Sequence, residues 1–251
     1  MSVGVQATIE SIYEIRLTRV RRLFYRTVYF RKGRTMKQYI LLDLDGTLTN
    51  SFEGITKCFQ YALAAFGIDE PDLEKMRPYI GPPLMDTFMK IYGFSEEKAA
   101  ALTAKYRERY NVEGWKENEV YDGIEEALQR LYNAGKILLV ATSKPQEQAI
   151  KILEHFGLAQ FFQDICGADP KTGRNHKDKV IQYALEKNGI KDLNSVLMIG
   201  DTKYDIIGAK QCGMDGMGVL YGFGTKEEME LAGAIAFAET PKEMAELVLA
   251  L

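Results

Sequence analysis

The sequence contains little cysteine, little histidine and no long apolar run. Its three cysteines, Cys58, Cys166 and Cys212, form no CxxC pair and leave an odd one, which excludes a disulfide framework or cysteine zinc site and indicates a reducing, cytoplasmic compartment. The two histidines, His155 and His176, match no metal-ligand spacing. No stretch approaches the roughly 18 apolar residues of a membrane-spanning helix, so an integral membrane protein is excluded.

The chain also has no large excess of charge of either sign. The chain has 32 basic and 35 acidic side chains, a net charge of −3, so no overall field attracts a nucleic acid polymer. Hydrophobic residues at 46% and charged residues at 27% exclude a disordered or collagen-like chain. A length of 251 residues suits one large domain or one domain with a substantial insertion.

The first 35 residues differ in charge from the rest of the chain. Residues 1–35 hold eight basic and two acidic side chains, which leaves 24 basic and 33 acidic for residues 36–251. This segment is either a targeting or surface-binding extension or an over-extended reading frame whose true start is Met36. We favour the second interpretation, because a clean strand pattern begins just after Met36.

After Met36, short apolar runs alternate with amphipathic stretches, which is typical of βα units and predicts an α/β fold with a Rossmann-like parallel sheet. The predicted strands are Gln38–Leu42, Ile137–Ala141, Phe162–Cys166, Val196–Ile199, Met217–Leu220 and Ala234–Phe237. The predicted helices are Gly123–Asn133, Gln146–Phe156, Lys177–Lys187, Asp205–Gln211, Lys226–Leu231 and Lys242–Leu249.

The interval from Phe52 to Asn118 breaks this alternation, since it has helical pattern and no convincing strand. It predicts an inserted all-helical cap at 51–118, within an α/β core made of 36–50 and 119–251. The expected cap helices are Gly54–Phe66, Leu84–Tyr92 and Glu96–Tyr110. The loop from Arg77 to Leu84 is either a rigid turn or a segment that hangs over the site, where Arg77 or Tyr79 could contact a leaving group.

Acidic residues follow two of the predicted strands where each strand ends. Asp43 and Asp45 follow the first strand, and Asp201 and Asp205 follow the strand at 196–199. If these strands are neighbours, the four carboxylates converge, and several hard oxygen ligands favour Mg²⁺ together with a phosphate. The loop after Asp43 is expected to offer free backbone amides to that phosphate, at Leu44, Gly46 and Thr47.

A third strand end adds groups suited to an anion. The strand at 137–141 runs into Thr142, Ser143 and Lys144 at the head of a helix, which offers a hydroxyl group and backbone amides. Phosphoryl transfer also needs a fixed counter-charge, for which Lys177 is our choice, with Lys171 and Lys179 as competitors.

These segments resemble the haloacid dehalogenase-like hydrolases, and specifically the phosphoglycolate phosphatase-like group with a helical cap. The DLDGTLT segment at 43–49 is similar to that family's first motif, and GDTKYD at 200–205 is similar to its fourth. Ser143 and Lys177 match the second and third motifs, and the resemblance extends from Met36 to the C-terminus.

The resemblance implies that Asp43 is the nucleophile, which forms an aspartyl-phosphate, and that Asp45 is the general acid and base. Mg²⁺ would be held by Asp43, the backbone carbonyl of Asp45, and Asp201, with Thr202 and Asp205 in support. The phosphate-binding residues expected from the motifs and loops are Leu44, Gly46, Thr47, Ser143, Lys144 and Lys177.

The expected activity is Mg²⁺-dependent hydrolysis of a small phosphorylated metabolite, similar to that of a phosphoglycolate phosphatase or a 5'-nucleotidase, by a monomer or homodimer. A sugar-phosphate mutase with the same aspartyl-phosphate is the alternative hypothesis. A non-catalytic binding module is a third hypothesis, and it is disfavoured because every expected catalytic position is occupied.

Overall fold

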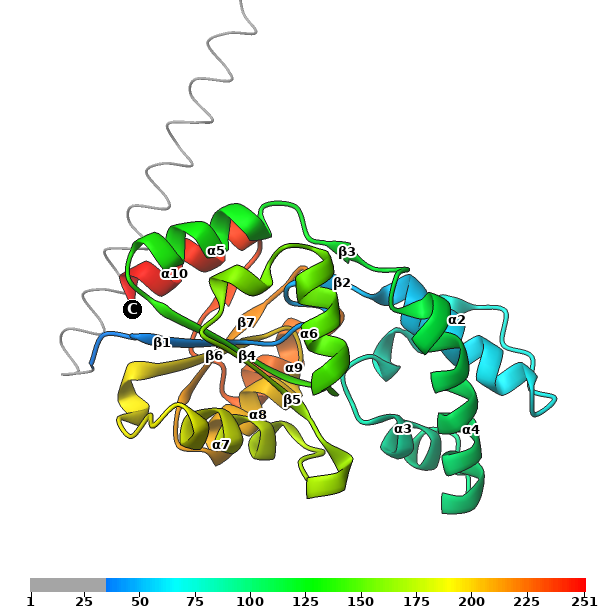
Figure 1. Ribbon diagram of the computed structural model, residues 1–251. Coiled ribbons are helices and arrows are strands. Elements are labelled where there is room, and N and C mark those ends of the chain that lie inside the picture. The colour runs from blue at the N-terminus through cyan, green and yellow to red at the C-terminus, as the bar shows by residue number, and fades with distance from the viewer. Residues whose placement is uncertain (1–34) are drawn as a thin grey trace, which may run out of the picture.

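The computed structural model describes residues 35–251, so the predicted extension at 1–35 lies outside the described residues except for Thr35. The chain forms a sheet-based core and a group of helices beside it, toward which the strands of the sheet run (Figure 1). No helix of the described part is both long and apolar enough to span a membrane.

The core is built on a six-stranded parallel sheet in the order β5-β4-β1-β6-β7-β8. Its strands are β1 (Tyr39–Leu42), β4 (Ile137–Pro145), β5 (Asp164–Ala168), β6 (Val196–Gly200), β7 (Asp215–Val219) and β8 (Phe237–Ala238). In the register of β1, Leu42 lies beside Val140 on one side and Ile199 on the other, so β1 and β6 end at the same edge while β4 continues past it to Pro145. The parallel α/β fold predicted from the sequence is confirmed.

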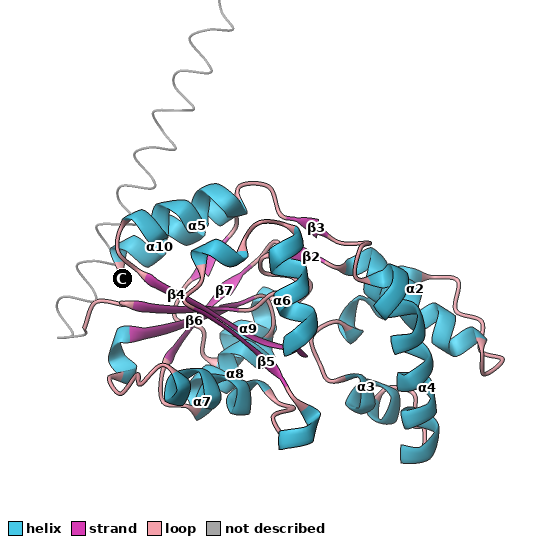
Figure 2. Cartoon of the chain, in the orientation of Figure 1, coloured by secondary structure: helices cyan, strands magenta, loops and turns pink. Residues whose placement is uncertain are grey.

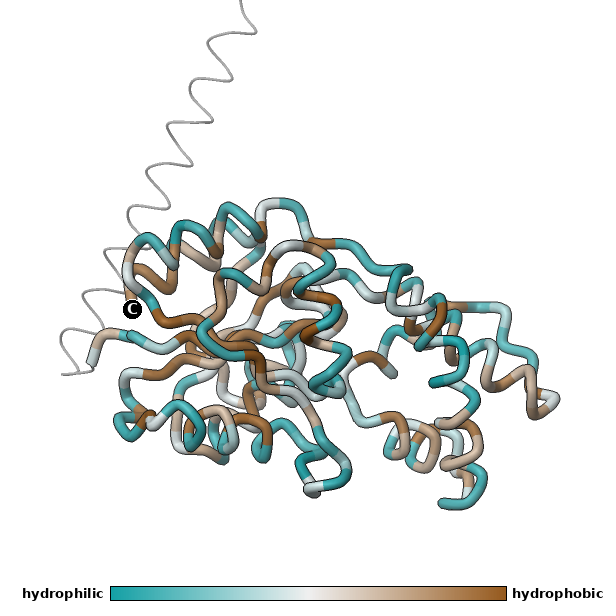
Figure 3. The backbone as a smooth tube through the Cα atoms, viewed as in Figure 1, coloured by the Kyte–Doolittle hydropathy of each residue, from teal (hydrophilic) through white to brown (hydrophobic). Residues whose placement is uncertain are grey.

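Helices cover both faces of this sheet (Figure 2). On one face lie α5 (Ile124–Asn133), α6 (Gln146–His155) and α10 (Pro241–Ala250); on the other lie α7 (Lys177–Lys187) and α8 (Lys203–Gln211), with α9 (Lys226–Ala232) beside α8. Successive strand residues point to opposite faces, so Ile40 and Leu42 pack into the first layer while Leu41 packs into the second. The brown tube through the sheet in Figure 3 marks these doubly buried strands.

The inserted helices form the cap, with an aromatic core of their own. They are α2 (Phe52–Ala64), the 3₁₀ helix η1 (Leu73–Tyr79), α3 (Leu84–Lys90), α4 (Glu96–Arg109) and a π-helical turn, η2 (Tyr110–Gly114). Phe59 is completely buried among Tyr79, Phe88 and Tyr106, with ring centroids 5.2–5.7 Å apart. A two-stranded antiparallel ribbon, β2 (Thr49–Asn50) and β3 (Glu119–Val120), joins the cap to the core.

Several element boundaries differ from the sequence pattern. The ribbon was missed because two residues are too few to show a period, and α3 ends two residues before the predicted Tyr92. The strand predicted at Met217–Leu220 begins at Asp215, since its glycines hide the apolar pattern. Three further 3₁₀ turns are η3 (Ala159–Phe161), η4 (Pro170–Thr172) and η5 (Leu193–Ser195).

Candidate active site

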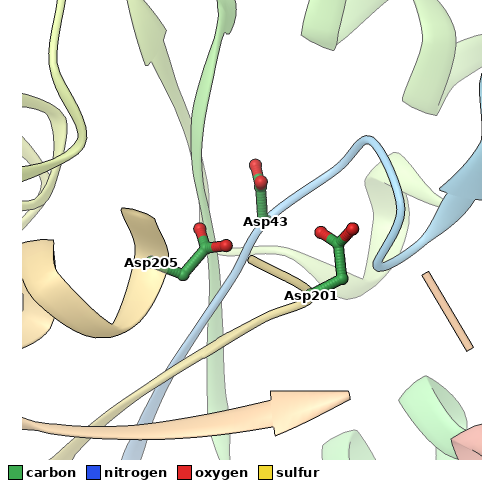
Figure 4. Close-up of side chains that lie close together, drawn as sticks. All are labelled: Asp43, Asp201 and Asp205. Carbon is green, nitrogen blue, oxygen red and sulfur yellow. The ribbon is translucent and has the colours of Figure 1, made fainter. Parts of the chain in front are cut away.

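The acidic residues predicted from the sequence meet where β1 and β6 end. Asp43 directly follows β1, and its N–H donates to the carbonyl of Ile199 in β6 at 2.9 Å. Asp201 directly follows β6, and Asp205 lies in the first turn of α8. Parallel neighbours present their carboxyl ends at the same edge, which brings the three carboxylates toward one another (Figure 4).

These carboxylates form one buried cluster around a single ammonium group. One oxygen from each of Asp43, Asp201 and Asp205 lies within 4.8 Å of the others. The Lys177 ammonium lies 2.9 Å from Asp43 Oδ1 and 2.7 Å from Asp205 Oδ1, and it donates to the carbonyl of Ala141 at 3.1 Å. When all three acids are ionised, the cluster therefore holds two negative charges that no residue of the cluster balances.

The electrostatics of the cluster reflect this excess. Burial raises the pKa of Asp43 to about 6, against the opposing effect of the Lys177 ammonium. Burial and the neighbouring Asp205 and Asp43 also raise the pKa of Asp201 well above its usual range. Burial acts to lower the pKa of Lys177, but the carboxylates of Asp205 and Asp43 outweigh it and raise that pKa, so the lysine stays charged.

Asp201 is held from several sides. Its carboxylate accepts hydrogen bonds from the Thr47 hydroxyl at 3.2 Å and the Phe223 N–H at 2.8 Å. Gly46 is required beside it, because its φ is +79° and an added Cβ would lie 2.1 Å from Asp201 Oδ2. A Cβ at Gly222 would also lie within 2.3 Å of the Asp201 side chain.

The segment Tyr221–Gly224 was not singled out from the sequence, although it also follows a strand at this edge. Its signal is two glycines that flank Phe223 directly after β7, which permit the close approach to Asp201.

The loop after Asp43 is closed by its own hydrogen bonds. The Leu44 N–H donates to Asp43 Oδ1 at 2.8 Å, the Gly46 N–H donates to the Thr49 carbonyl at 2.8 Å, and the Thr47 N–H donates to the Leu44 carbonyl at 3.2 Å. The amides of Gly46 and Thr47 are therefore not free, contrary to the sequence expectation, because the turn satisfies them internally.

The support expected from Thr202 takes the form of a helix cap. Its N–H and hydroxyl donate to Asp205 Oδ2 at 3.1 and 2.8 Å, which fixes that carboxylate at the start of α8. The other oxygen of Asp205 is thereby left toward Lys177.

Asp45 is bound by a lysine that was expected to bind phosphate. The Lys144 ammonium donates to both oxygens of Asp45, at 2.9 and 2.8 Å, and both side chains are largely buried. The ring of Tyr110, from the cap, lies 4.9 Å from the same ammonium. A cap residue thus meets the ion pair that contains the predicted general acid.

Two hydroxyl groups lie at the end of the apolar part of β4. Ser143, chosen from the sequence, lines the cavity beside Asp43. The hydroxyl of Thr142, which the sequence argument did not select, hydrogen-bonds to Asp43 and lowers the pKa of that carboxyl. Thr142 is buried. Because Thr142 and Ser143 are adjacent and both carry a hydroxyl group, nothing in the sequence pattern showed which of them would contact Asp43.

A cavity of about 450 Å³ opens from Asp43 and Asp45 toward the cap. Its cap wall is mainly apolar and aromatic and includes Tyr79, Leu84 and Tyr106. The sequence left open whether Arg77 or Tyr79 reaches this space. Tyr79 lines the cavity, whereas Arg77 pairs with Glu74 at 2.9 Å and lies over the Phe52 ring.

The sequence matches the model of one protein family, described as haloacid dehalogenase-like hydrolase, over residues 40–219. A 5'-nucleotidase of Pseudomonas aeruginosa is 46% identical over 76% of this chain and 86% of its own length. A phosphoglycolate phosphatase of Vibrio parahaemolyticus is 29% identical over 83% of this chain and 95% of its own length.

Tyrosine-protein kinase PtkA of Mycobacterium tuberculosis is 38% identical over 74% of this chain, and the match covers 63% of that kinase. Among solved structures, a protein described as a predicted phosphatase from Clostridium acetobutylicum aligns with a TM-score of 0.84 at 43% identity. That alignment covers 86% of this chain and all of the Clostridium chain.

Proposed function

Because the chain belongs to the haloacid dehalogenase-like hydrolase family and is a phosphatase of its phosphoglycolate phosphatase-like group, we propose that it hydrolyses a small phosphate monoester with Mg²⁺, through an aspartyl-phosphate on Asp43. The observation that carries this proposal is the placement of Asp43. Its carboxylate lines the cavity and lies beside the Lys177 ammonium and two further carboxylates.

The cluster fits a magnesium ion in both charge and donor type. Its donors are hard carboxylate oxygens, and its two unbalanced negative charges equal the charge that a divalent cation supplies. Asp43, Asp201 and the backbone carbonyl of Asp45 would hold the ion, with Asp205 in the same cluster. When bound, Mg²⁺ would offset negative charge on the phosphoryl oxygens.

The residues of the chain divide the reaction into two displacements. The Asp43 carboxylate attacks phosphorus and forms the aspartyl-phosphate while the ester bond breaks, and Asp45 gives its proton to the departing oxygen. Asp45 then takes a proton from the water that cleaves the acyl phosphate, which returns Asp43 to its carboxylate form. Lys177 and Ser143 hold the phosphoryl oxygens throughout.

The ion pair between Lys144 and Asp45 gives Lys144 a place in this cycle. An ammonium that donates to both carboxylate oxygens of Asp45 occupies the atoms that must exchange a proton with the leaving oxygen and with water. We infer that Lys144 transfers to the incoming phosphate, which would free Asp45 to donate its proton. The expected phosphate-binding role of Lys144 and its observed partner then describe two stages of one cycle.

The cavity favours a nucleoside monophosphate over phosphoglycolate. Its volume of about 450 Å³ falls within the range of about 300–1,000 Å³ typical of sites for larger organic ligands, and its wall includes three tyrosines. A two-carbon glycolate would leave most of this aromatic wall without a contact, whereas a ring system would cover it.

The test is phosphate release from p-nitrophenyl phosphate, phosphoglycolate and nucleoside 5'-monophosphates, with Mg²⁺ or with EDTA. We expect turnover that requires Mg²⁺, is lost in Asp43→Asn, and is unchanged in the matched control Asp69→Asn, whose carboxylate is exposed on the cap. Turnover in Asp43→Asn at the wild-type rate would contradict the assignment of the nucleophile.

Product analysis separates the mutase alternative. A mutase would return the phosphoryl group to a sugar phosphate and would need a bisphosphate activator, whereas the proposed enzyme releases inorganic phosphate without one. Absence of turnover across the whole panel would favour the binding module. We further propose that the protein acts in the cytoplasm. We also propose that it is a monomer or homodimer, which sedimentation of the full chain would test.

A further inference from the structure

A second cavity of about 750 Å³ adjoins the one that contains Asp43. We name the cavity at Asp43 the inner chamber and this second cavity the outer chamber. The two share part of their walls, namely Arg107, Tyr110, Pro145, Gln148, Ala168 and Pro170. The outer chamber lies between α4 and η2 of the cap and α6 and η4 of the core. A phosphate ester bound at Asp43 can therefore extend its leaving group from the inner into the outer chamber.

The outer chamber is basic in a part of the chain that is acidic as a whole. Residues 36–251 contain 24 basic and 33 acidic side chains, yet four cations and two acids line this chamber. The cations are Arg107, Lys151, Lys171 and Arg174, and the acids are Glu147 and Asp169. The Asp169 carboxylate is already engaged, since it accepts from the Lys171 N–H at 3.1 Å and the Thr172 hydroxyl at 3.1 Å. Four positive and two negative side chains leave the lining with a formal net charge of +2.

None of these four cations forms an ion pair with a residue in 35–251. Lys151 lies over the Trp115 ring at 3.7 Å, and Arg174 donates to the carbonyl of Gly167 at 2.8 Å. The side chains of Arg107 and Lys171 have no hydrogen bond to any described residue. Arg107 belongs to the cap and Lys171 to the core, so the two unengaged cations come from the two parts that enclose the cleft.

Arg107 also stands at the junction of the chambers, one helical turn after Thr103 on the same face of α4. Thr103 is 5% exposed, lines the inner chamber, and its hydroxyl has no hydrogen-bond partner among the described residues. On the core side of the inner chamber, Asn175 is only half-buried, but its Oδ1 atom is buried and has no hydrogen-bond partner among the described residues. Unpaired buried polar atoms are costly, so a ligand that pairs them is expected in this space.

We propose that the outer chamber binds a second anionic group on the leaving group, and that Arg107 is the residue that selects it. The preferred substrate is then a phosphate monoester whose leaving group carries a carboxylate or a further phosphate, with Thr103 and Asn175 contacting polar atoms between the two ends. An anion between Arg107 and Lys171 would offset two positive charges and join cap to core. This inference rests on the proposed phosphatase activity, because it places the reacting phosphate at Asp43.

The test compares three substrates that share one reacting phosphate. Uridine 5'-monophosphate has a neutral leaving group, orotidine 5'-monophosphate adds a carboxylate to the base, and uridine 3',5'-bisphosphate adds a phosphate to the sugar. We expect the wild-type kcat/KM to favour at least one anionic substrate by about tenfold or more, as expected for one charged hydrogen bond. The anionic substrate with the higher kcat/KM identifies whether the preferred group is a carboxylate or a phosphate.

Variants assign this preference to the chamber. Arg107→Gln should bring the ratio of anionic to neutral kcat/KM close to one while kcat/KM for the neutral substrate is retained, and Arg107→Lys should keep part of the preference. Arg130→Gln, an exposed arginine on α5, is the matched control and should keep the full ratio. Equal kcat/KM for all three substrates in the wild type, or an equal loss for all three in Arg107→Gln, would overturn the proposal.

A failure of the proposed function would be recognised separately. If no ester, including p-nitrophenyl phosphate, is hydrolysed in Mg²⁺, the same three nucleotides are titrated into the full chain by calorimetry. If an anionic nucleotide binds more tightly than uridine 5'-monophosphate and this difference is lost in Arg107→Gln, the outer chamber is an anion site even without turnover. Equal dissociation constants for the three nucleotides would reject the anion site.

Discussion

Replacement of Asp43 by asparagine should stabilise the metal-free protein by an amount that grows with pH. Burial raises the pKa of Asp43 from its ordinary 3.8 to about 6 in the folded chain. A raised carboxyl pKa gives the folded state a stabilising contribution that is fully present below 3.8 and lost as the pH rises through about 6. The whole difference corresponds to about 3 kcal/mol of unfolding free energy.

Only part of that difference falls in a convenient range. At pH 5 the folded Asp43 is still mostly protonated while the unfolded one is mostly ionised, so about half of this difference remains to be lost between pH 5 and 7.5. The asparagine side chain of the variant cannot ionise, so the variant has no such loss. The unfolding free energy of Asp43→Asn relative to wild type should therefore rise by roughly 1–2 kcal/mol over this range.

The assay is urea unfolding in EDTA at pH 5, 6, 6.75 and 7.5, for wild type, Asp43→Asn and the surface control Asp69→Asn. The control should run parallel to wild type, because its carboxylate is exposed on the cap. A difference between Asp43→Asn and wild type that is the same at every pH would refute the claim that burial governs this carboxyl group. If the unfolding free energy of Asp43→Asn relative to wild type falls as the pH rises, the pKa of Asp43 is lowered in the folded chain and not raised.

Two other substitutions test how the cluster is held. Lys177→Met leaves the buried carboxylates without their ammonium, so it should lower the unfolding free energy in EDTA by about 3–5 kcal/mol, measured by urea unfolding, and abolish turnover. An unchanged unfolding midpoint would contradict that role. Gly46→Ala should lower the melting temperature and the Mg²⁺ affinity, since the added Cβ would lie 2.1 Å from Asp201 Oδ2. The matched control is Gly67→Ala, because Gly67 also has a positive φ but has open space around it. The control should lower the unfolding free energy by about 1 kcal/mol and leave Mg²⁺ affinity unchanged. Equal effects of the two alanines on Mg²⁺ titration would show that the contact with Asp201 is irrelevant.

The convergence of the acidic cluster could be predicted because it depends on topology alone. Asp43 and Asp201 each follow a short apolar run, and parallel neighbours end at one edge, so two strand assignments suffice to bring them together. Lys177 was selected on another ground, the counter-charge that phosphoryl transfer needs together with the other motifs, and it lies at the first position of α7 with its ammonium on Asp43 and Asp205. The exact boundaries of the strands were not needed for this inference, and the predicted β1 and β6 differ from the observed ones by one residue each.

The partners within the site could not be predicted, because they depend on side-chain directions that no periodicity encodes. Lys144 was expected to bind phosphate, and its contact with Asp45, 99 positions away in the sequence, was not foreseen. Phe223 reaches Asp201 through its backbone, for which the residue type carries no signal beyond the flanking glycines. Thr142 and Ser143 are adjacent hydroxyl residues, and only the geometry of β4 places the Thr142 hydroxyl on Asp43.

The charge of the cluster has a consequence for the order in which ligands bind. When all three acids of the cluster are ionised, their carboxylates outnumber the single ammonium of Lys177, so a phosphate dianion that approaches in EDTA meets net negative charge at close range. We therefore expect inorganic phosphate to bind at pH 8 with Mg²⁺ and to give no calorimetric signal in EDTA. Asp201→Asn removes one of these charges without touching Lys177 and should restore weak phosphate binding in EDTA. If wild type binds phosphate equally with and without Mg²⁺, or if Asp201→Asn binds none in EDTA, repulsion by the carboxylates does not govern entry to the site.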